Sequence, residues 1–517
     1  MERKKEKWNK RKIIYSVILI LGVISRIYRL NSVPGGINQD EAFAAREAWS
    51  LLTSGKDSFG YPWPMYLIAW GSGMNVLNSI LMIPFIAAFG RHTWVFRLPQ
   101  LIVSICTIVA VEKIVRETIN GEVSLWAMFL LTISPWHIMM SRWGLESNLA
   151  PGFLVFGLLF FIQGIKNEKF FLLSAFFYGL SLYCYATIWP IVPFIVLLQV
   201  IYLLYVRKAK MTKWTVASGI LLGILAIPVF LFLLVNKGII GEIVTPVLSI
   251  PKLVVMREGE ISVDQIGKKT ENLLSILINE NDGRYWNSTG QFGLYYKCFL
   301  IFAVIGLLYC IKGVYRSLKT RIYDGYVFIG IQFLTAFVLG MLIYVNVNRI
   351  NCIHISIIIF MAAGIYHVQQ MIRNDLKYIK EITIAGFLLC FLLFEHFYFG
   401  EYARDIGRMF QDGIEPAVRY AENLAGEENT IYVDESILYS KVLAFSKLTP
   451  EEYRETVQYA NYPAVYLKIS TCGNYMFGTS LEGKDGIYII DLTTQTESCV
   501  DMGYTVEQFG NIAVVYK

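Results

Sequence analysis

Long apolar segments separated by short polar ones run through residues 1–400. The stretches 13–25, 148–164 and 382–394 contain no charged residue at all. A helix of about 20 apolar residues is long enough to cross the hydrocarbon core of a bilayer. The pattern predicts about eleven membrane-spanning helices, at residues 12–30, 97–116, 121–139, 149–165, 170–187, 189–206, 214–236, 295–312, 322–345, 350–371 and 381–400.

Basic residues between these spans indicate the orientation of the chain. Every second loop carries a group of them, and these groups include Lys113, Arg116, Lys166, Lys169, Arg207, Lys208, Lys210, Lys213, Lys312, Arg316, Lys319 and Arg321. The loops on the other side contain mainly Arg142 and Arg349. Because lysine and arginine accumulate in cytoplasmic loops, we expect the N-terminus in the cytoplasm and the C-terminal region outside.

Two segments near the start affect this count. The basic stretch 1–11 followed by an apolar run is also typical of a cleaved signal peptide. The run continues through Arg26 and Arg29 without a small-residue cleavage site, so we interpret it as a retained first span. The apolar segment 74–90 is short for a crossing, and counting it would place the basic groups outside. We therefore expect this segment on the outer membrane surface.

Composition supports a chain built for the bilayer. Of 517 residues, 55% are hydrophobic and 17% are charged, whereas a soluble domain has about 25% charged residues. The net charge of +6 is carried largely by short loops, which indicates membrane orientation rather than nucleic-acid binding. These values predict a multi-pass protein of the plasma membrane.

Three regions are expected outside. They are a first outer loop with surface helices at 31–97, a long loop at 237–294 and a tail at 401–517. The tail has a helix-like pattern at 415–424 and strand-like patterns at 430–433, 464–469, 486–491 and 512–515. The predicted fold is therefore mainly α, a polytopic helical bundle over 1–400 with a small extracytoplasmic α/β domain over 401–517.

Two of the eight cysteines, Cys472 and Cys499, lie in this tail. They can pair in an oxidising compartment. They can equally be unpaired, because spacing along the chain does not show contact.

Acidic residues follow the first span directly. Asp40 and Glu41 stand at the start of a helical pattern that continues to Leu52. Asn38 and Glu41 are spaced as a capping box, and an acid in the first turn suits the helix dipole, so helix capping explains these residue types too. Capping does not require two adjacent acids at a bilayer surface, so a catalytic role stays open.

Polar residues also gather in two later outer turns. Arg142 and Glu146 are four residues apart and can simply pair on a helix. Arg349 stands between Asn348 and Asn351, where a lone arginine can also extend to lipid headgroups. Flanking asparagines favour a polar site over this alternative.

The order of these features resembles the GT-C glycosyltransferases. The features are the Asp40-Glu41 pair, Arg-Leu-Pro at 97–99, and the turn with Ser-Pro-Trp-His at 134–137 that ends at Glu146. The most similar group is the protein O-mannosyltransferase-like family, which includes the lipid A aminoarabinose transferases. The resemblance is specific over about 31–167, and the rest of the chain is similar in topology and hydropathy.

The resemblance implies a membrane enzyme that moves a sugar, as a hexosyltransferase does, from a polyprenyl-phosphate carrier. The acceptor would be a protein, a glycan or a lipid on the outer face. The first-loop aspartate of the family corresponds to Asp40, with Glu41 beside it, and the second-loop acid corresponds to Glu146.

The chain departs from the family at one point. Many members carry a Lys-Pro motif that binds the carrier phosphate, and this chain has Tyr-Pro-Trp-Pro at 61–64 instead. The phosphate-binding role is therefore assigned to Arg142 and Arg349, with Asn348 and Asn351 beside the latter.

The chemistry of such a transfer fits these residue types. Displacement at the anomeric carbon needs a base that takes the acceptor's proton, and Asp40 is the candidate. Phosphate is already a good leaving group, so one carboxylate suffices for an inverting reaction, and an arginine stabilises the departing charge. The sequence assigns no definite cofactor, and Glu41 and Glu146 are suited to holding the acceptor, the sugar or a divalent metal ion.

Two other classes of protein share some of these features. A transporter or flippase usually places ionisable residues inside the membrane along a pathway, and the predicted spans contain few. A non-catalytic scaffold for the tail would need neither eleven spans nor acids in the first outer loop. Both alternatives agree less well with polar residues gathered at outer turns.

Overall fold

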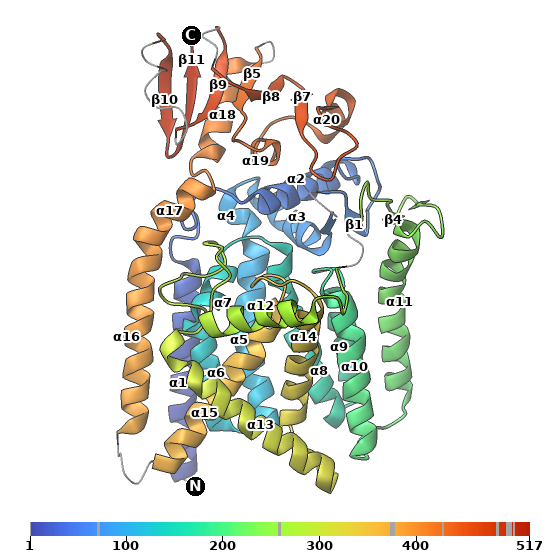
Figure 1. Cartoon of the computed structure of the whole chain (residues 1–517), viewed down its shortest axis with the longest axis vertical. Helices are drawn as coiled ribbons and strands as arrows, with labels where there is room; N and C mark the ends of the chain where they lie inside the picture. Colours follow the sequence, from blue (N-terminus) through green and yellow to red (C-terminus); the bar gives the residue numbers. More distant parts are fainter. Residues whose placement is uncertain are drawn as a thin grey trace.

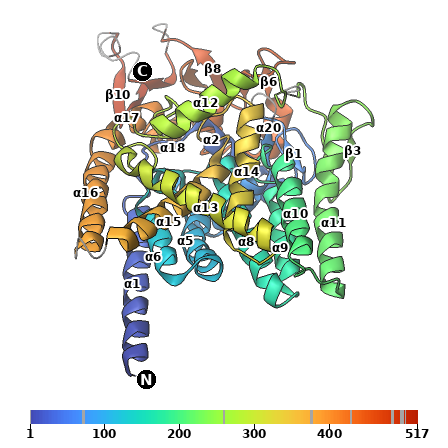
Figure 2. The ribbon, with the colours of Figure 1, turned by 60° about the horizontal axis from the view of Figure 1, so that its bottom comes forward.

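The structure is a computed structural model that describes residues 2–69, 73–256, 260–372, 378–426, 429–481, 485–492, 499 and 502–517. A body of long helices carries a small domain with a β-sheet at one end (Figure 1). The N-terminus lies at the free end of the first helix, on the side away from the sheet (Figure 2). The predicted architecture, a mainly helical bundle followed by an α/β domain, is confirmed.

The helical body contains all of the predicted spans as helices. Its members are α1 (Glu2–Ile27), α5 (Leu98–Thr118), α6 (Gly121–Ile133), α7 (Pro135–Met140), α8 (Glu146–Lys166), α9 (Phe170–Ser181), α10 (Ile188–Tyr205), α11 (Lys213–Asn236), α13 (Leu300–Thr320), α14 (Tyr326–Leu342), α15 (His354–Ile372) and α16 (Ile379–Phe399). Within the described residues, seven helices are long and apolar enough to cross a membrane. Three others of the body, α6, α9 and α14, are apolar but shorter. The number of eleven crossings therefore stays a prediction.

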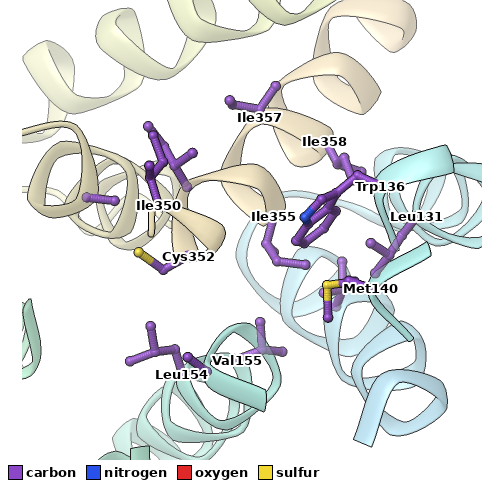
Figure 3. Close-up of a cluster of buried hydrophobic side chains, with 14 of the residues drawn as sticks. Leu131, Trp136, Met140, Leu154, Val155, Ile350, Cys352, Ile355, Ile357 and Ile358 are labelled. Carbon is purple, nitrogen blue, oxygen red and sulfur yellow. The ribbon is translucent and has the colours of Figure 1, made fainter. Parts of the chain in front are cut away.

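The centre of the body is packed with aliphatic and aromatic side chains. Trp136 lies beside Ile355 and Ile358 of α15 and faces Leu131 of α6 (Figure 3). Its indole nitrogen donates a hydrogen bond to Asn351 Oδ1 at 2.9 Å. A buried tryptophan needs such a partner for its N–H group. This contact ties the turn between α6 and α8 to the turn before α15.

A set of short elements lies mainly at the end of the body that carries the sheet (Figure 1). It comprises α2 (Gln39–Ser54), β1 (Tyr66–Leu67), β2 (Met74–Asn75), α3 (Leu77–Phe89), α4 (Thr93–Phe96), β3 (Ile243–Val244), β4 (Ser249–Ile250), α12 (Ile266–Asn279), η1 (Lys297–Phe299) and η2 (Asn351–Ile353). The apolar segment at 74–90 forms β2 and α3, and α3 lies beside α2 beneath the C-terminal domain (Figure 1). This position agrees with the expectation of a surface helix.

The C-terminal domain is built around a mixed sheet. Its elements are α17 (Glu401–Met409), α18 (Ile414–Ala425), β5 (Ile431–Asp434), α19 (Tyr439–Leu443), α20 (Pro450–Thr456), β6 (Gln458–Tyr459), β7 (Ile469–Cys472), β8 (Tyr475–Thr479), β9 (Ile487–Asp491), β10 (Thr505–Phe509) and β11 (Ile512–Tyr516). Within the described residues the strand order is β10-β11-β9-β5-β8-β7-β6. The central β5 is parallel to β8 and β9, and the other pairs are antiparallel.

The helix and three of the four strands predicted in this domain are confirmed. The prediction at 464–469 is wrong, because β7 begins only at Ile469. Strands β8 and β10 were missed, and both alternate buried with exposed positions only weakly. No disulfide joins Cys472 to Cys499 among the described residues, and the two side chains belong to different apolar clusters, which agrees with the alternative without a bridge between them.

The C-terminal domain and the first outer loop share one apolar cluster. Side chains from α2, α3 and α4 pack in it together with side chains from α18, α19 and the sheet. The backbone also joins them, since Ile37 N donates to Phe410 O at 2.9 Å. Gly36 has φ +69° and lies so close that a Cβ there would be 2.2 Å from Phe410 O. The first outer loop is thus held between the membrane helices and the tail domain.

Candidate active site

Asp40 stands in the first turn of α2, the helix that follows α1 in the chain. The side chain of Asn38 caps this helix and accepts a hydrogen bond from Asp40 N at 2.9 Å. The N-cap predicted at Asn38 is therefore present. The reciprocal half of the capping box is not formed, because the Glu41 carboxylate pairs with Arg97 instead. The Asp40 side chain is half-buried and lines a pocket of about 330 Å³.

This pocket, called here the Asp40 pocket, lies where five distant parts of the chain meet. Its residues come from the first outer loop, the turn before α8, two later outer loops and the C-terminal domain. They are Asn38, Gln39, Asp40, Trp143, Leu145, Trp286, Asn348, Met409, Phe410, Gln411, Ser436, Leu438 and Lys441. Polar side chains make up about half of this lining, and aromatic and aliphatic side chains make up the rest.

Glu41 has a different environment from its neighbour. It is fully buried, and its carboxylate pairs with Arg97, with Nε to Oε1 at 3.1 Å and Nη2 to Oε2 at 3.3 Å. Gly144 N also donates to Glu41 Oε1 at 2.7 Å. These contacts occupy the carboxylate, so Glu41 holds the outer turns together and does not line the Asp40 pocket.

Arg97 of the Arg-Leu-Pro motif is the partner of Glu41 in this ion pair. Besides Glu41, its guanidinium donates to the carbonyl oxygens of Leu30, Pro34 and Gly36. The side chain is fully buried. The motif therefore fixes the path of the first outer loop, which the sequence could not reveal.

Arg142 does not reach the pocket. Its five N–H groups donate to the backbone carbonyls of Ser25, Arg26, Tyr28 and Val33, at 2.7–3.2 Å. The side chain is fully buried. A guanidinium whose donors are all engaged has none left for a phosphate, so this geometry speaks against the phosphate-binding role expected for Arg142.

Glu146 lies at the start of α8, near Asp40. It is largely buried and accepts a hydrogen bond from Asn75 N. It does not pair with Arg142, contrary to the simplest explanation of their spacing, because Arg142 bonds to carbonyls instead. The carboxylates of Glu146 and Asp40 are close enough to repel each other electrostatically.

Tyr185, in the turn between α9 and α10, lies within electrostatic range of both acids and of Arg349. Burial raises the pKa of its phenol to about 12, the Glu146 carboxylate adds to the rise, and Arg349 opposes it. Arg349 is partly exposed and donates to Tyr344 O at 3.2 Å and to Glu260 Oε1 at 3.3 Å. Tyr183 and Trp189, the other aromatic residues of this region, bond to backbone carbonyls within the helical body.

The two asparagines beside Arg349 have separate roles. Asn348 lines the Asp40 pocket. Asn351 is buried and fully engaged, because it accepts from Trp136 and donates to Ser147 O and Asn148 Oδ1. The structure therefore brings Asp40 and Asn348 to one pocket, with Glu146 and Arg349 around Tyr185 nearby, and leaves Asn351 in the scaffold.

Several residues of the pocket were not expected from the sequence. Trp286, Gln411 and Lys441 come from loops and short helices without a recognisable motif. No cluster of three or more metal-ligating side chains occurs in the part of the chain that the structure describes. A larger cavity of about 420 Å³ lies between α8, α9, α10 and α11 near Lys208 and Lys210, and Asp40 is not part of it.

Comparison with known proteins shows a family match for part of the sequence and a similar fold for the whole chain. The family described as dolichyl-phosphate-mannose-protein mannosyltransferase matches residues 77–233. The fold is similar to that of ArnT from Cupriavidus metallidurans in the apo state, with a TM-score of 0.54, 10% identity and coverage of 99% of this chain and 98% of ArnT. The same protein bound to undecaprenyl phosphate gives a TM-score of 0.54 at 11% identity, with 97% of each chain covered.

A more distant likeness extends to a larger protein. The oligosaccharyltransferase of Archaeoglobus fulgidus, in complex with zinc and sulfate, has a TM-score of 0.50 and 13% identity over 84% of this chain and 61% of its own. The family match over residues 77–233 and the ArnT-like fold over nearly the whole chain support the resemblance to the GT-C glycosyltransferases that was inferred from the sequence. No curated protein sequence matches the chain.

Proposed function

We propose that this chain transfers a sugar from a polyprenyl-phosphate carrier to an acceptor hydroxyl, on a protein, a glycan or a lipid, at the outer membrane face. The observation that carries the proposal is the position of Asp40 in a pocket between the membrane helices and the C-terminal domain. The ArnT structure bound to undecaprenyl phosphate, which has the same fold, supports a carrier of this kind.

Asp40 is the proposed base. Its carboxylate takes the proton as the acceptor oxygen attacks the anomeric carbon, and the bond from that carbon to the phosphate oxygen breaks. The electron pair of that bond stays on the phosphate, which leaves as the free lipid phosphate. One carboxylate is sufficient because phosphate needs no strong acid to depart.

The neighbouring charges assist this step in the proposal. Glu146 adds negative charge beside Asp40, which favours a proton on one of the two carboxylates. Arg349, with Tyr185, lies at the edge of this group and is suited to an anionic part of the substrate. Trp143 and Trp286 offer flat apolar faces to a sugar ring.

The proposed orientation follows the basic loops of the sequence. The N-terminus lies in the cytoplasm, and the Asp40 pocket and the C-terminal domain lie outside. The two ends of the chain are on opposite sides of the helical body, as this orientation requires (Figure 1).

The test compares wild type with Asp40→Asn and with Asp264→Asn, which changes an exposed carboxylate of the long outer loop. The purified proteins receive a panel of polyprenyl-phosphate sugars with acceptor extracts, and release of free polyprenyl phosphate is measured. Asp40→Asn should lose at least ~10²-fold in rate, while Asp264→Asn keeps full activity. Full activity of Asp40→Asn would show that Asp40 is not the base and serves only at the start of the helix. A wild type that releases carrier from no donor would favour a transporter.

A further inference from the structure

Lys441 is a buried ammonium group that faces the Asp40 pocket. It lies on α19 of the C-terminal domain, its side chain is only 6% exposed, and it is part of the pocket wall. Among the described residues, its Nζ forms no hydrogen bond or ion pair, and this atom is not cut off from solvent, so it reaches the open pocket. A lysine whose side chain is largely buried usually has a partner for its charge.

The surroundings of Lys441 do not supply that partner. Asp491 is the carboxylate that acts on it most strongly, but Asp491 Oδ2 accepts a hydrogen bond from Gln411 Nε2 at 2.8 Å. Burial lowers the pKa of the Lys441 ammonium to about 8, so it keeps its charge at neutral pH. The ammonium group therefore keeps N–H donors for a ligand in the pocket that it lines.

A hydrogen bond of the residue before it holds Lys441 next to the first outer loop. Its neighbour Ser440 donates from Oγ to Gln39 O at 3.5 Å, one residue before Asp40. The C-terminal domain thus places a positive charge in the same pocket as the proposed base. A transfer from a sugar phosphate needs this combination, a carboxylate for the acceptor's proton and a cation for the departing phosphate.

We propose that Lys441 binds the phosphate of the polyprenyl-phosphate donor, so that the C-terminal domain completes the active site. This inference rests on the proposed function. It replaces Arg142, whose donors are all engaged by backbone carbonyls. It also gives the tail domain a chemical role in addition to its packing on the outer loop.

The apolar side of the pocket favours a lipid phosphate over a free one. Met409 and Phe410 line it at the end of α17, which follows α16 out of the helical body. Met409 is 51% exposed, and α16 carries exposed leucines along its length, among them Leu389, Leu392 and Leu393. An isoprenoid chain can therefore lie along α16 while its phosphate reaches Lys441.

The experiment measures binding of a polyprenyl monophosphate to the full-length protein by titration calorimetry in detergent. The variants are Lys441→Met and Lys441→Arg, and the control is Lys447→Met, which removes an exposed lysine of the same domain bonded to Asn423. The Lys441→Met protein should bind the polyprenyl phosphate at least ~10-fold more weakly than wild type, because a charged hydrogen bond is lost. The affinity should fall less in Lys441→Arg and should not change in Lys447→Met. Thermal unfolding should show Lys441→Met at least as stable as wild type, because an apolar chain replaces an unpaired charge.

The other outcomes separate the two proposals. Equal binding by wild type and Lys441→Met would overturn the role of Lys441 and leave the proposed function intact. No binding of any polyprenyl phosphate by wild type would overturn both. Inorganic phosphate serves as a second probe, and Lys441-dependent binding of it with equal affinity would support the anion site while overturning the lipid carrier as its source.

Discussion

Buried charges organise the outer end of the helical body residue by residue. Arg97 and Arg142 each direct five N–H groups at carboxylate or carbonyl oxygens, and both are inaccessible to solvent. A planar guanidinium can satisfy several carbonyls that the irregular outer turns leave without partners. Two neighbouring acids, Asp40 and Glu41, thereby have different environments, since Glu41 pairs with Arg97 and only Asp40 lies in the pocket.

Replacing Glu41 with glutamine should destabilise the protein strongly. The change leaves the charge of Arg97 buried without a counter-ion, which typically costs about 3–5 kcal/mol. Thermal unfolding of the purified variant should show a clear fall in Tm, whereas Asp40→Asn should unfold near the wild-type temperature. A Glu41→Gln protein that is as stable as wild type but inactive would contradict the structural role and make Glu41 part of the chemistry.

At the scale of elements, the first outer loop is shaped by what lies on both sides of it. On the side of the helical body, Arg97 and Arg142 donate hydrogen bonds to its backbone carbonyls. On the side of the C-terminal domain, Ile37 N donates to Phe410 O. Gly36 allows this approach because its φ of +69° and its missing side chain leave room for the Phe410 carbonyl. The position of Asp40 relative to Lys441 depends on this contact.

Introducing a side chain at Gly36 should therefore separate the first outer loop from the C-terminal domain. In Gly36→Val, Cβ would meet the Phe410 carbonyl, and a branched residue also resists positive φ. We expect faster proteolysis within residues 401–517 and a loss of transfer activity that exceeds the loss of Tm. Gly241→Val is the control, because no atom lies within 4 Å of a Cβ built there. Similar digestion of the two variants would show that the contact is dispensable.

The whole molecule is a bundle and a tail that cannot be separated cleanly. The shared apolar cluster includes Met82 and Ile86 of α3 as well as Ile414 and Val418 of α18. A cut after residue 400 would expose this surface to water, which makes truncation a poor way to distinguish an enzyme from a scaffold. Point changes in the Asp40 pocket are the better test.

The orientation of the whole chain is a separate prediction. A phosphatase that folds only in an oxidising compartment should be active when fused after Lys517 and inactive when fused after Lys208, because the basic loops stay in the cytoplasm. Enzyme activity in cells expressing each fusion is the measurement, with protein amounts compared by immunoblot. Activity after Lys208 would invert the topology and place the Asp40 pocket inside.

The sequence by itself determined the helical body, the outer loops and the α/β tail, because hydrophobic runs and alternations are local properties that burial imposes along each element. It also indicated Asp40, since an acid beside a span is visible without neighbours. It could not assign Glu41, Arg142 or Asn351 to the scaffold, because their partners are distant in sequence. Only the tertiary structure brings Lys441 to a pocket 401 positions from Asp40, since the docking of the tail on the first outer loop creates that pocket.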